Sequence, residues 1–210
     1  MDIVYKKWTD ISIKLFYEIN DILIDKTTSD IEKKISLIAL LSNTDESQVR
    51  DMSLTDFNKC LTDIEWLNSP NFNRDTNIKT LEIDGKKYNI VRKLKNITIA
   101  QYIDFQTFWQ KKDLKHYTGN LLACFILPST SKKYAEDYDP LELADLLNNN
   151  LDIVTAQSLL FFFLKQYLTL MVSSFTYLRK KVKTKEEREV LTNTLQGILH
   201  GLQLSTLSQI

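Results

Sequence analysis

The sequence predicts a mainly α protein, built as one or more multi-helix bundles with one central β-hairpin. Glycine and proline are scarce, with four and three copies in 210 residues, whereas multi-stranded β folds and glycine-rich phosphate-binding folds use glycine at turns and close approaches. Several segments begin with helix-capping signatures. The stretch 78–92 combines alternating apolar and polar residues with a hairpin turn signal.

Capping residues mark several helix starts. Ser29, Thr98 and Thr184 are each followed three positions later by Glu or Gln, which is the spacing of a capping box. Asp139 precedes Pro140, so a carboxylate at the N-cap is followed by proline at the first helical position. Apolar residues recur at three and four positions between these signals. We therefore expect helices over residues 10–24, 29–42, 45–51, 54–67, 98–111, 114–127, 140–148, 153–182 and 185–204.

A polar, turn-rich linker at 68–77 is expected to divide the chain. Before it, residues 1–67 form an acidic helical part, in which residues 1–66 hold 13 Asp and Glu against eight Lys and Arg. After it, residues 78–210 form the hairpin and a C-terminal helical domain, which opens with a basic segment. This reversal of charge fits either two solvated faces or head-to-tail attraction between copies of the chain.

The hairpin is expected to be a contact element. Asp84 and Gly85 suit the two central positions of a type I′ turn, both of which need positive φ. A lone hairpin is marginal in water, so this one must pack on helices or add strands from another copy. The candidate contact residues are Ile83, Asp84, Gly85, Lys86, Lys87 and Tyr88.

The long helix expected at 153–182 must be covered nearly all round. Phe161, Phe162 and Phe163 are consecutive, so they face three directions about 100° apart on a helix. Two interpretations stay open. The helix is the centre of the C-terminal core, or its exposed side buries against another subunit, and the second makes the three phenylalanines contact residues.

Membranes and nucleic acids are not favoured as partners. A membrane span needs about 20 predominantly apolar residues, and Lys165, Gln166 and several hydroxyl residues interrupt this segment. The basic run 179–185 has no accompanying aromatic stacking pattern, and the net charge of the chain is zero. We expect this run to be a solvated surface.

A tyrosine-bearing loop at 127–140 is the last candidate contact element. Tyr134 and Tyr138 are four positions apart within it. Either their rings pack on the neighbouring helices with wet hydroxyl groups, or the loop itself is an interaction surface, because tyrosine gives a large contact area at low entropic cost.

The sequence points to no catalytic, cofactor-binding or metal site. His116 and His200 have no Cys or carboxylate neighbours at metal-ligand spacing, and no nucleotide-binding or hydrolase motif occurs. Cys60 and Cys124 form no readable disulfide framework, which fits a reducing compartment. The N-terminus lacks the basic-then-apolar order of a secretion signal. We expect a protein that is not an enzyme and has no cofactor or small-molecule ligand.

Two groups of segments resemble tailed-bacteriophage morphogenesis proteins. The first resembles the N-terminal helices of tail assembly chaperones, and it comprises IALLSNTDESQV at 38–49 and MSLTDFN at 52–58. The second is similar to proteins from structural gene modules of crAss-like and related gut phages, and it comprises IDGKKY at 83–88, ITIAQYIDF at 97–105, FILP at 125–128, YD at 138–139 and FFF at 161–163.

The resemblance implies a non-enzymatic role in virion assembly. The favoured version is a ring-type structural component of the neck or tail, whose partners are other copies of itself and other phage structural proteins. One alternative is a tail assembly chaperone that binds a helical partner and leaves before the virion matures. Another is a host-directed phage protein that binds a bacterial regulator or nuclease. The implied location is the virion, or the host cytoplasm during assembly.

Overall fold

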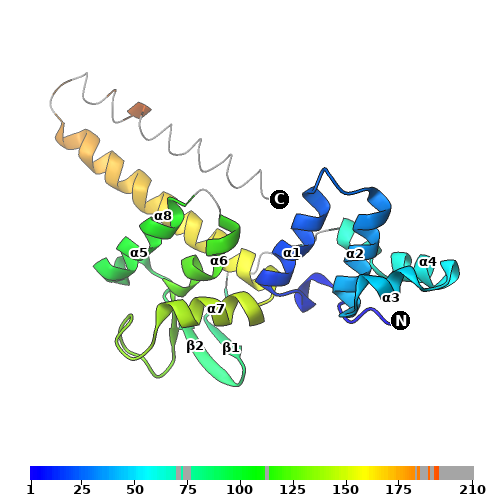
Figure 1. Ribbon diagram of the computed structural model, residues 1–210. Coiled ribbons are helices and arrows are strands. Elements are labelled where there is room, and N and C mark those ends of the chain that lie inside the picture. Colours follow the sequence, from blue (N-terminus) through cyan, green and yellow to red (C-terminus); the bar gives the residue numbers. More distant parts are fainter. Residues whose placement is uncertain are drawn as a thin grey trace. The chain divides into compact units, whose positions relative to one another are not determined.

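The computed structural model describes residues 1–69, 72, 77–111, 114–182, 184, 189 and 192–193, without the side chains of Lys95, Leu114 and Met171. The fold is mainly helical, with 63% of residues in helices and 8% in strands. It contains eight α-helices and one small antiparallel sheet of three strands among the described residues (Figure 1). The predicted fold class is confirmed.

The chain forms two compact units. The first contains Met1–Arg92 and Ile97–Leu160, and the second contains Lys93–Asn96 and the chain from Phe161 onward. Residues before and after the expected 68–77 linker both belong to the first unit, and a division of the chain at that linker stays a prediction.

The N-terminal helices begin at serine caps. The side chains of Ser12, Ser29 and Ser53 each accept a hydrogen bond from the backbone amide three residues later, at 3.1–3.3 Å. Two predicted helices, 10–24 and 54–67, are each divided between an α-helix and a separate 3₁₀ turn. The elements are η1 (Trp8–Asp10), α1 (Ile13–Ile24), α2 (Asp30–Ser42), α3 (Glu46–Arg50), α4 (Leu54–Asp63) and η2 (Glu65–Asn68).

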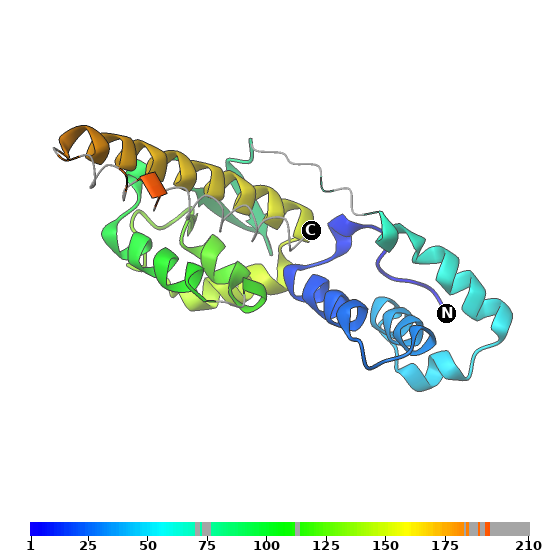
Figure 2. The same ribbon diagram turned by 90° about the horizontal axis from the view of Figure 1, so that it is seen from above.

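The later helices follow the predicted order. Thr98 and Gln101 form a complete capping box, and the Asp139 carboxylate accepts a hydrogen bond from the Leu141 amide at 2.8 Å. The predicted helix 185–204, with its start at Thr184, falls largely outside the described residues. The elements are η3 (Leu94–Asn96), α5 (Ile99–Trp109), α6 (Leu114–Ala123), α7 (Pro140–Asn150) and α8 (Ile153–Lys181), which is yellow to orange in Figure 2.

The hairpin is present, with β1 at Thr80–Ile83 and β2 at Lys86–Ile90. Asp84 and Gly85 have φ values of 50° and 71°, as a type I′ turn requires. A third strand, β3 (Ile126–Pro128), pairs antiparallel with β2 and gives the strand order β1-β2-β3. The hairpin therefore gains its third strand from the same chain, whereas the sequence left open whether another copy supplies one.

The third strand corrects one predicted helix. Residues 114–127 were expected to be helical throughout, but α6 ends at Ala123. Two physical causes favour the change. Proline disfavours a helical conformation in the residue before it, and the extended segment before Pro128 satisfies its backbone by pairing with β2.

The core of the first unit is built around α6, which packs against α5, α7 and α1. Gly119 allows the close approach of α6 and α7, because a Cβ atom there would lie 2.5 Å from the Ala144 carbonyl oxygen. The Gly119 amide donates to the Asn148 side chain at 3.1 Å. Among the largest fully buried side chains are Ile11, Ile13, Ile19, Ile38, Leu41, Leu122, Phe125, Ile126 and Leu147.

The segment before α1 is joined to the segment before α8. The Ile13 amide donates to the Leu151 carbonyl at 3.1 Å, and the Ile153 amide donates to the Ile11 carbonyl at 2.8 Å. These two bonds surround an antiparallel bridge between Ser12 and Asp152. Residues far apart in the sequence are thereby held together within the first unit.

Candidate protein interaction surface

The apolar side chains of the hairpin are buried in the folded chain. Ile83 and Tyr88 are only 5% and 4% exposed, and burial raises the pKa of Tyr88. Tyr88 lies opposite Leu81 on β1 and opposite Pro128 on β3, so its ring is on the inner face of the sheet. These two predicted contact residues are core residues of the first unit.

The hairpin tip is exposed and polar. Asp84, Gly85, Lys86 and Lys87 are all exposed, and Lys87 lies opposite Glu82 on β1. Among the predicted hairpin contact residues, these four are accessible to a partner. They offer charge and hydrogen bonds but little apolar area, and exposed ion pairs contribute little binding energy.

The tyrosines of the 127–140 loop are half-buried. The Tyr134 hydroxyl donates to the Asp104 carboxylate at 2.8 Å, and the Tyr134 and Tyr138 rings meet edge to face at 6.3 Å. Burial raises the pKa of both phenols, that of Tyr138 to about 12. The rings pack on the fold, as one interpretation expects, but the expected wet hydroxyl groups are not found, because the Tyr134 hydroxyl binds Asp104 and the Tyr138 hydroxyl is buried.

The three phenylalanines on α8 differ in burial, as their different directions require. Phe163 is buried, whereas Phe161 and Phe162 are half-buried. The Phe162 and Phe163 rings meet edge to face with centroids 5.4 Å apart. Phe161 and Phe162 therefore retain area for a further contact.

A stripe along α8 changes from buried to exposed, and the sequence reasoning missed it. We define the α8 stripe as Phe163, Tyr167, Leu170 and Tyr177, which share one face of the helix because they are spaced by four, three and seven positions. Their exposed fractions are 2%, 8%, 42% and 61%. The available signal was the apolar helical period, which is interrupted at Ser174 and resumes at Tyr177.

The opposite face of α8 carries a shallow apolar groove. Phe161, Leu164, Leu168 and Val172 line it at spacings of three and four, and its volume is about 570 Å³. Lys165, Thr169 and Ser173 form a polar margin along it. We call this the α8 groove.

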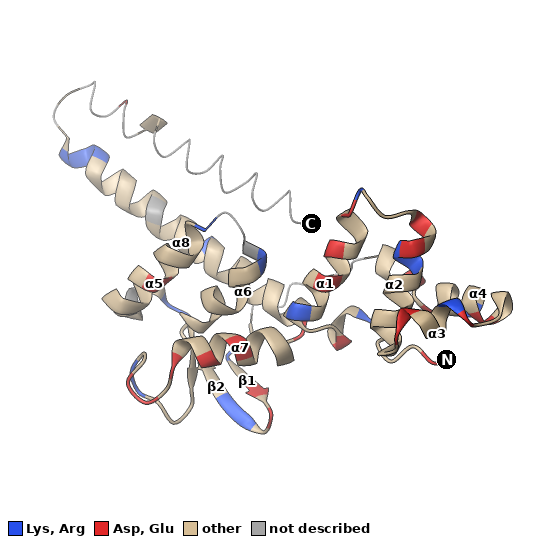
Figure 3. Ribbon diagram, in the orientation of Figure 1, with Lys and Arg blue, Asp and Glu red and all other residues tan. Residues whose placement is uncertain are grey.

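Positive charge gathers at the end of α8. Arg179, Lys180 and Lys181 occupy its last turn (Figure 3), where cations interact favourably with the carbonyl end of the helix. The Lys181 ammonium lies 5.6 Å from the centre of the Tyr177 ring. The exposed end of the α8 stripe is therefore bordered by cations.

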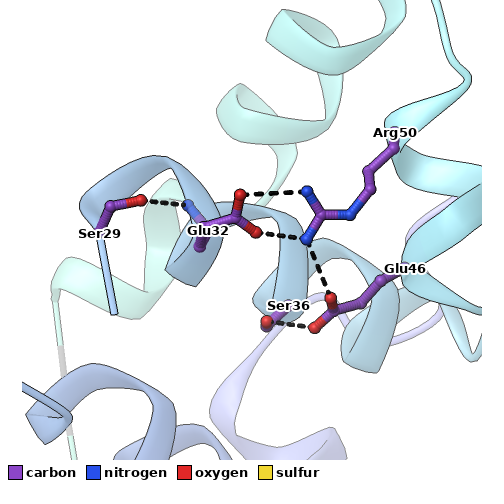
Figure 4. A network of polar contacts seen from close by, with 5 residues as sticks. All are labelled: Ser29, Glu32, Ser36, Glu46 and Arg50. Carbon is purple, nitrogen blue, oxygen red and sulfur yellow. Dashed lines mark hydrogen bonds and ion pairs between the residues drawn. The ribbon is translucent and has the colours of Figure 1, made fainter. Parts of the chain in front are cut away.

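An exposed ion-pair network joins α2 to α3 (Figure 4). Arg50 binds both carboxylate oxygens of Glu32, one at 3.0 Å, and one oxygen of Glu46 at 3.3 Å. Ser36 donates to the other Glu46 oxygen. This pairing lowers the pKa of Glu32 and occupies the carboxylate that the predicted capping box would have used at Ser29. The network is a brace between two helices and not a catalytic arrangement.

No group of three or more His, Cys, Asp or Glu side chains that could hold a metal ion occurs among the described residues. Cys60 and Cys124 are buried free thiols, and burial raises the pKa of both, that of Cys124 to about 12. Thiols protonated at neutral pH are poor nucleophiles and poor metal ligands. His116 is exposed, and His200 lies outside the described residues.

One described helix, α8, is long and apolar enough to cross a membrane when judged by length and composition alone. Mostly buried core helices of soluble proteins pass the same test, whereas 18% of the tested stretch of α8 is buried. Its first residues, from Ile153 to Leu160, belong to the first compact unit, where Ile153, Ala156 and Leu159 are buried. This segment is therefore already used by the fold.

Comparison of the chain with protein-family models, curated proteins and solved structures finds no match.

Proposed function

We propose that this chain is a non-enzymatic virion assembly protein that acts through protein–protein contacts, as a structural component of the neck or tail of a tailed phage. The α8 stripe is the observation that carries the contact role. The phage setting is supported by the sequence resemblance of residues 38–58 and 83–163.

The α8 stripe suits a protein partner because its exposed half continues a buried face. Burying a large apolar side chain contributes about 1.5–3 kcal/mol, and Leu170 and Tyr177 are 42% and 61% exposed in the single chain. Tyrosine is enriched at the centres of protein interfaces. Covering these two side chains would therefore favour association.

The spacing of the stripe favours a helical partner. Residues that recur at three, four and seven positions form a straight ridge, which fits the groove of another helix. The cations at 179–181 would attract an acidic surface, and residues 1–66 of another copy carry such an excess of acidic residues. Head-to-tail contact between copies is therefore the arrangement that we favour.

The same ridge also suits a tail assembly chaperone, whose partner would be a helix of another protein. The two roles differ in whether the protein stays in the finished particle. Stoichiometric protein in purified particles would support the structural role. Its presence only in infected-cell lysate, bound to a helical partner, would replace that role with the chaperone.

Substitution of the stripe tests the contact role directly. Leu170→Asp combined with Tyr177→Asp places two carboxylates on the proposed interface, and Leu54→Asp is a matched control, because Leu54 is 75% exposed on α4. We expect size-exclusion chromatography with light scattering to show assemblies of the unmodified chain and of Leu54→Asp. The double variant should elute as a monomer with an unchanged far-UV spectrum. A monomer for all three proteins, together with no partner captured from purified particles, would contradict the proposal.

A further inference from the structure

We propose that the free edge of β1 is a docking site for β1 of a second copy of this chain, with the two strands paired antiparallel about a two-fold axis at Leu81. The contact goes beyond the proposed function and does not rest on it, since no residue of α8 takes part.

The backbone groups on the free side of β1 are spaced for a second strand. The strand order β1-β2-β3 places no further strand beside β1 among the described residues (Figure 1). The Ile90 amide donates to the Lys79 carbonyl at 3.1 Å, and hydrogen-bonded pairs alternate with non-hydrogen-bonded pairs along an antiparallel ladder. Leu81 therefore bonds to β2, whereas the amides and carbonyls of Thr80 and Glu82 point to the free side.

These outward backbone groups are self-complementary. They lie two residues apart, so a second β1 that runs in the opposite direction places its Glu82 opposite Thr80 and its Thr80 opposite Glu82. Each of these two pairs exchanges two backbone hydrogen bonds, which gives four in all. A two-fold axis is the commonest symmetry of soluble homo-oligomers, and it needs only one surface that matches itself. β1 alone therefore supplies both sides of the contact.

Leu81 is the apolar centre of this edge. Its side chain is half-buried, whereas Ile83 on the same face of the sheet is 5% exposed. In the two-fold register, Leu81 lies opposite Leu81 of the second copy in a non-hydrogen-bonded pair, the kind in which side chains approach most closely. Tyr88 on β2 lies on the other side of Leu81 and extends this apolar row. Pairing would therefore cover the apolar area that the single chain leaves open at the edge.

The outer face of the edge is complementary in its polar groups. Thr80 and Glu82 are exposed, and Glu82 lies opposite Lys87 on β2. A second copy would place its Thr80 on the other side of Glu82, where the threonine hydroxyl can donate to the carboxylate. No two like charges are directly opposite each other across the two β1 strands in this register. The side chains therefore favour the same register as the backbone.

The other edge of the sheet differs from this one. β3 has three residues and ends in Pro128, which has no amide to donate. Short edge strands and proline are common means by which natural proteins prevent pairing at a sheet edge. β1 has four residues and no proline. The fold therefore protects the β3 edge and leaves the β1 edge able to pair.

The proposed contact is small. One short strand from each copy makes an interface of the weak, transient class. We therefore expect the copies to separate at the dilute concentrations of chromatography, where the variant of the α8 stripe elutes as a monomer. The pairing has to be captured covalently.

Symmetric cysteines test the pairing. Leu81→Cys puts the two thiols at directly opposite positions, with Cα atoms about 4.5 Å apart, which suits a disulfide. Thr80→Cys is the matched control, because this exposed position lies diagonally from its counterpart, about 7–8 Å away. Both proteins also carry Leu170→Asp and Tyr177→Asp, so the result does not depend on the proposed α8 contact. The two native cysteines can stay, since both are buried.

We expect Leu81→Cys to form a disulfide-linked dimer at least about tenfold faster than Thr80→Cys, because pairing raises the effective concentration of the two thiols. Adding Thr80→Pro to the Leu81→Cys protein should slow the reaction at least about fivefold, because it removes an outward amide from each copy and no bond to β2. Equal rates for the two cysteine variants would overturn the proposal, as would a rate that Thr80→Pro leaves unchanged.

A second measurement covers the case in which Leu81→Cys disturbs the inner face of the sheet. Thr80→Cys protein is mixed with Glu82→Cys protein, since both positions are exposed and the register places them opposite each other. Their Cα atoms would be about 5.5 Å apart, so the mixed dimer should form at least about fivefold faster than either homodimer. A random mixture of the three dimers would overturn the proposal.

Discussion

The sheet and the outer half of α8 contain similar side chains but use them differently. Tyr88, on β2, is 4% exposed, whereas Tyr177, on α8, is 61% exposed. The apolar side chains of the sheet, such as Ile83 and Tyr88, are buried, while the α8 stripe runs from buried Phe163 to exposed Tyr177. A region's capacity for contact therefore depends on the apolar surface that the fold leaves uncovered, and not on how apolar its sequence is.

The largest expected effect is a difference in the free energy of unfolding between truncations of the two tyrosines, Tyr88 and Tyr177. Tyr88→Ala removes a buried ring between Leu81 and Pro128 and should lower the free energy of unfolding by about 3–5 kcal/mol. Tyr177→Ala should change it by less than about 0.5 kcal/mol, because surface substitutions rarely cost more. Urea unfolding followed by circular dichroism measures both. Equal losses of stability in the two variants would show that the sheet and the outer half of α8 do not differ in burial.

A smaller effect is expected at the hairpin turn. Gly85→Val should cost about 1–2 kcal/mol, because the φ of 71° is unfavourable for a residue with a Cβ atom and worse for a β-branched one. Gly85→Asn is the matched variant, since asparagine tolerates this conformation better. Thermal unfolding should rank the glycine protein first, the asparagine variant second and the valine variant last. A valine variant as stable as the asparagine variant would refute the turn assignment.

The smallest effect on the structure is expected when the labelling rates of two thiols are compared, that of Cys124 and that of a thiol introduced at position 177. Cys124 lies just before β3 and has a pKa of about 12, so at pH 8 iodoacetamide should label it at least about 100-fold more slowly than an exposed thiol introduced by Tyr177→Cys. Peptide mass spectrometry reports each site. Fast labelling of Cys124 in folded protein would show that the sheet region opens readily.

The same thiol gives a dependence of stability on pH. The folded-state pKa of Cys124 is above its ordinary value of 9.0. Its contribution to stability is therefore complete below pH 9 and is lost as the pH rises toward about 12. Unfolding in urea at pH 8 and at pH 10.5 should show lower stability at the higher pH.

The helices were predictable because their signals are local. Ser29 and Thr98 cap helices where their sequence motifs indicate, and Asp84-Gly85 forms the predicted turn. The strand at Ile126–Pro128 was not predictable, because it depends on pairing with β2, which is more than 30 residues away. Glu32 similarly binds Arg50 instead of its own helix cap, which no local pattern indicates.

The sequence allowed us to predict the kinds of side chain that form the candidate surface, but not which of them are exposed. The sequence identified apolar and tyrosine-rich elements, but burial in the tertiary fold decides which side chains remain available. Ile83 and Tyr88 are buried by non-local neighbours. Leu170 and Tyr177 are exposed although they continue the same helical period as buried Phe163 and Tyr167. Predicting such differences in burial requires knowledge of all the contacts around each helix or strand.

The bridge between residues 11–13 and 151–153 has a consequence for synthesis on the ribosome. The backbone amide of Ile13 has its partner at Leu151, so the first helices emerge long before the strand-like segment that pairs with them exists. Contacts of such large sequence separation slow folding and leave apolar surface open in the meantime. Residues 11–13 therefore cannot form these two backbone hydrogen bonds until residues 151–153 have been translated.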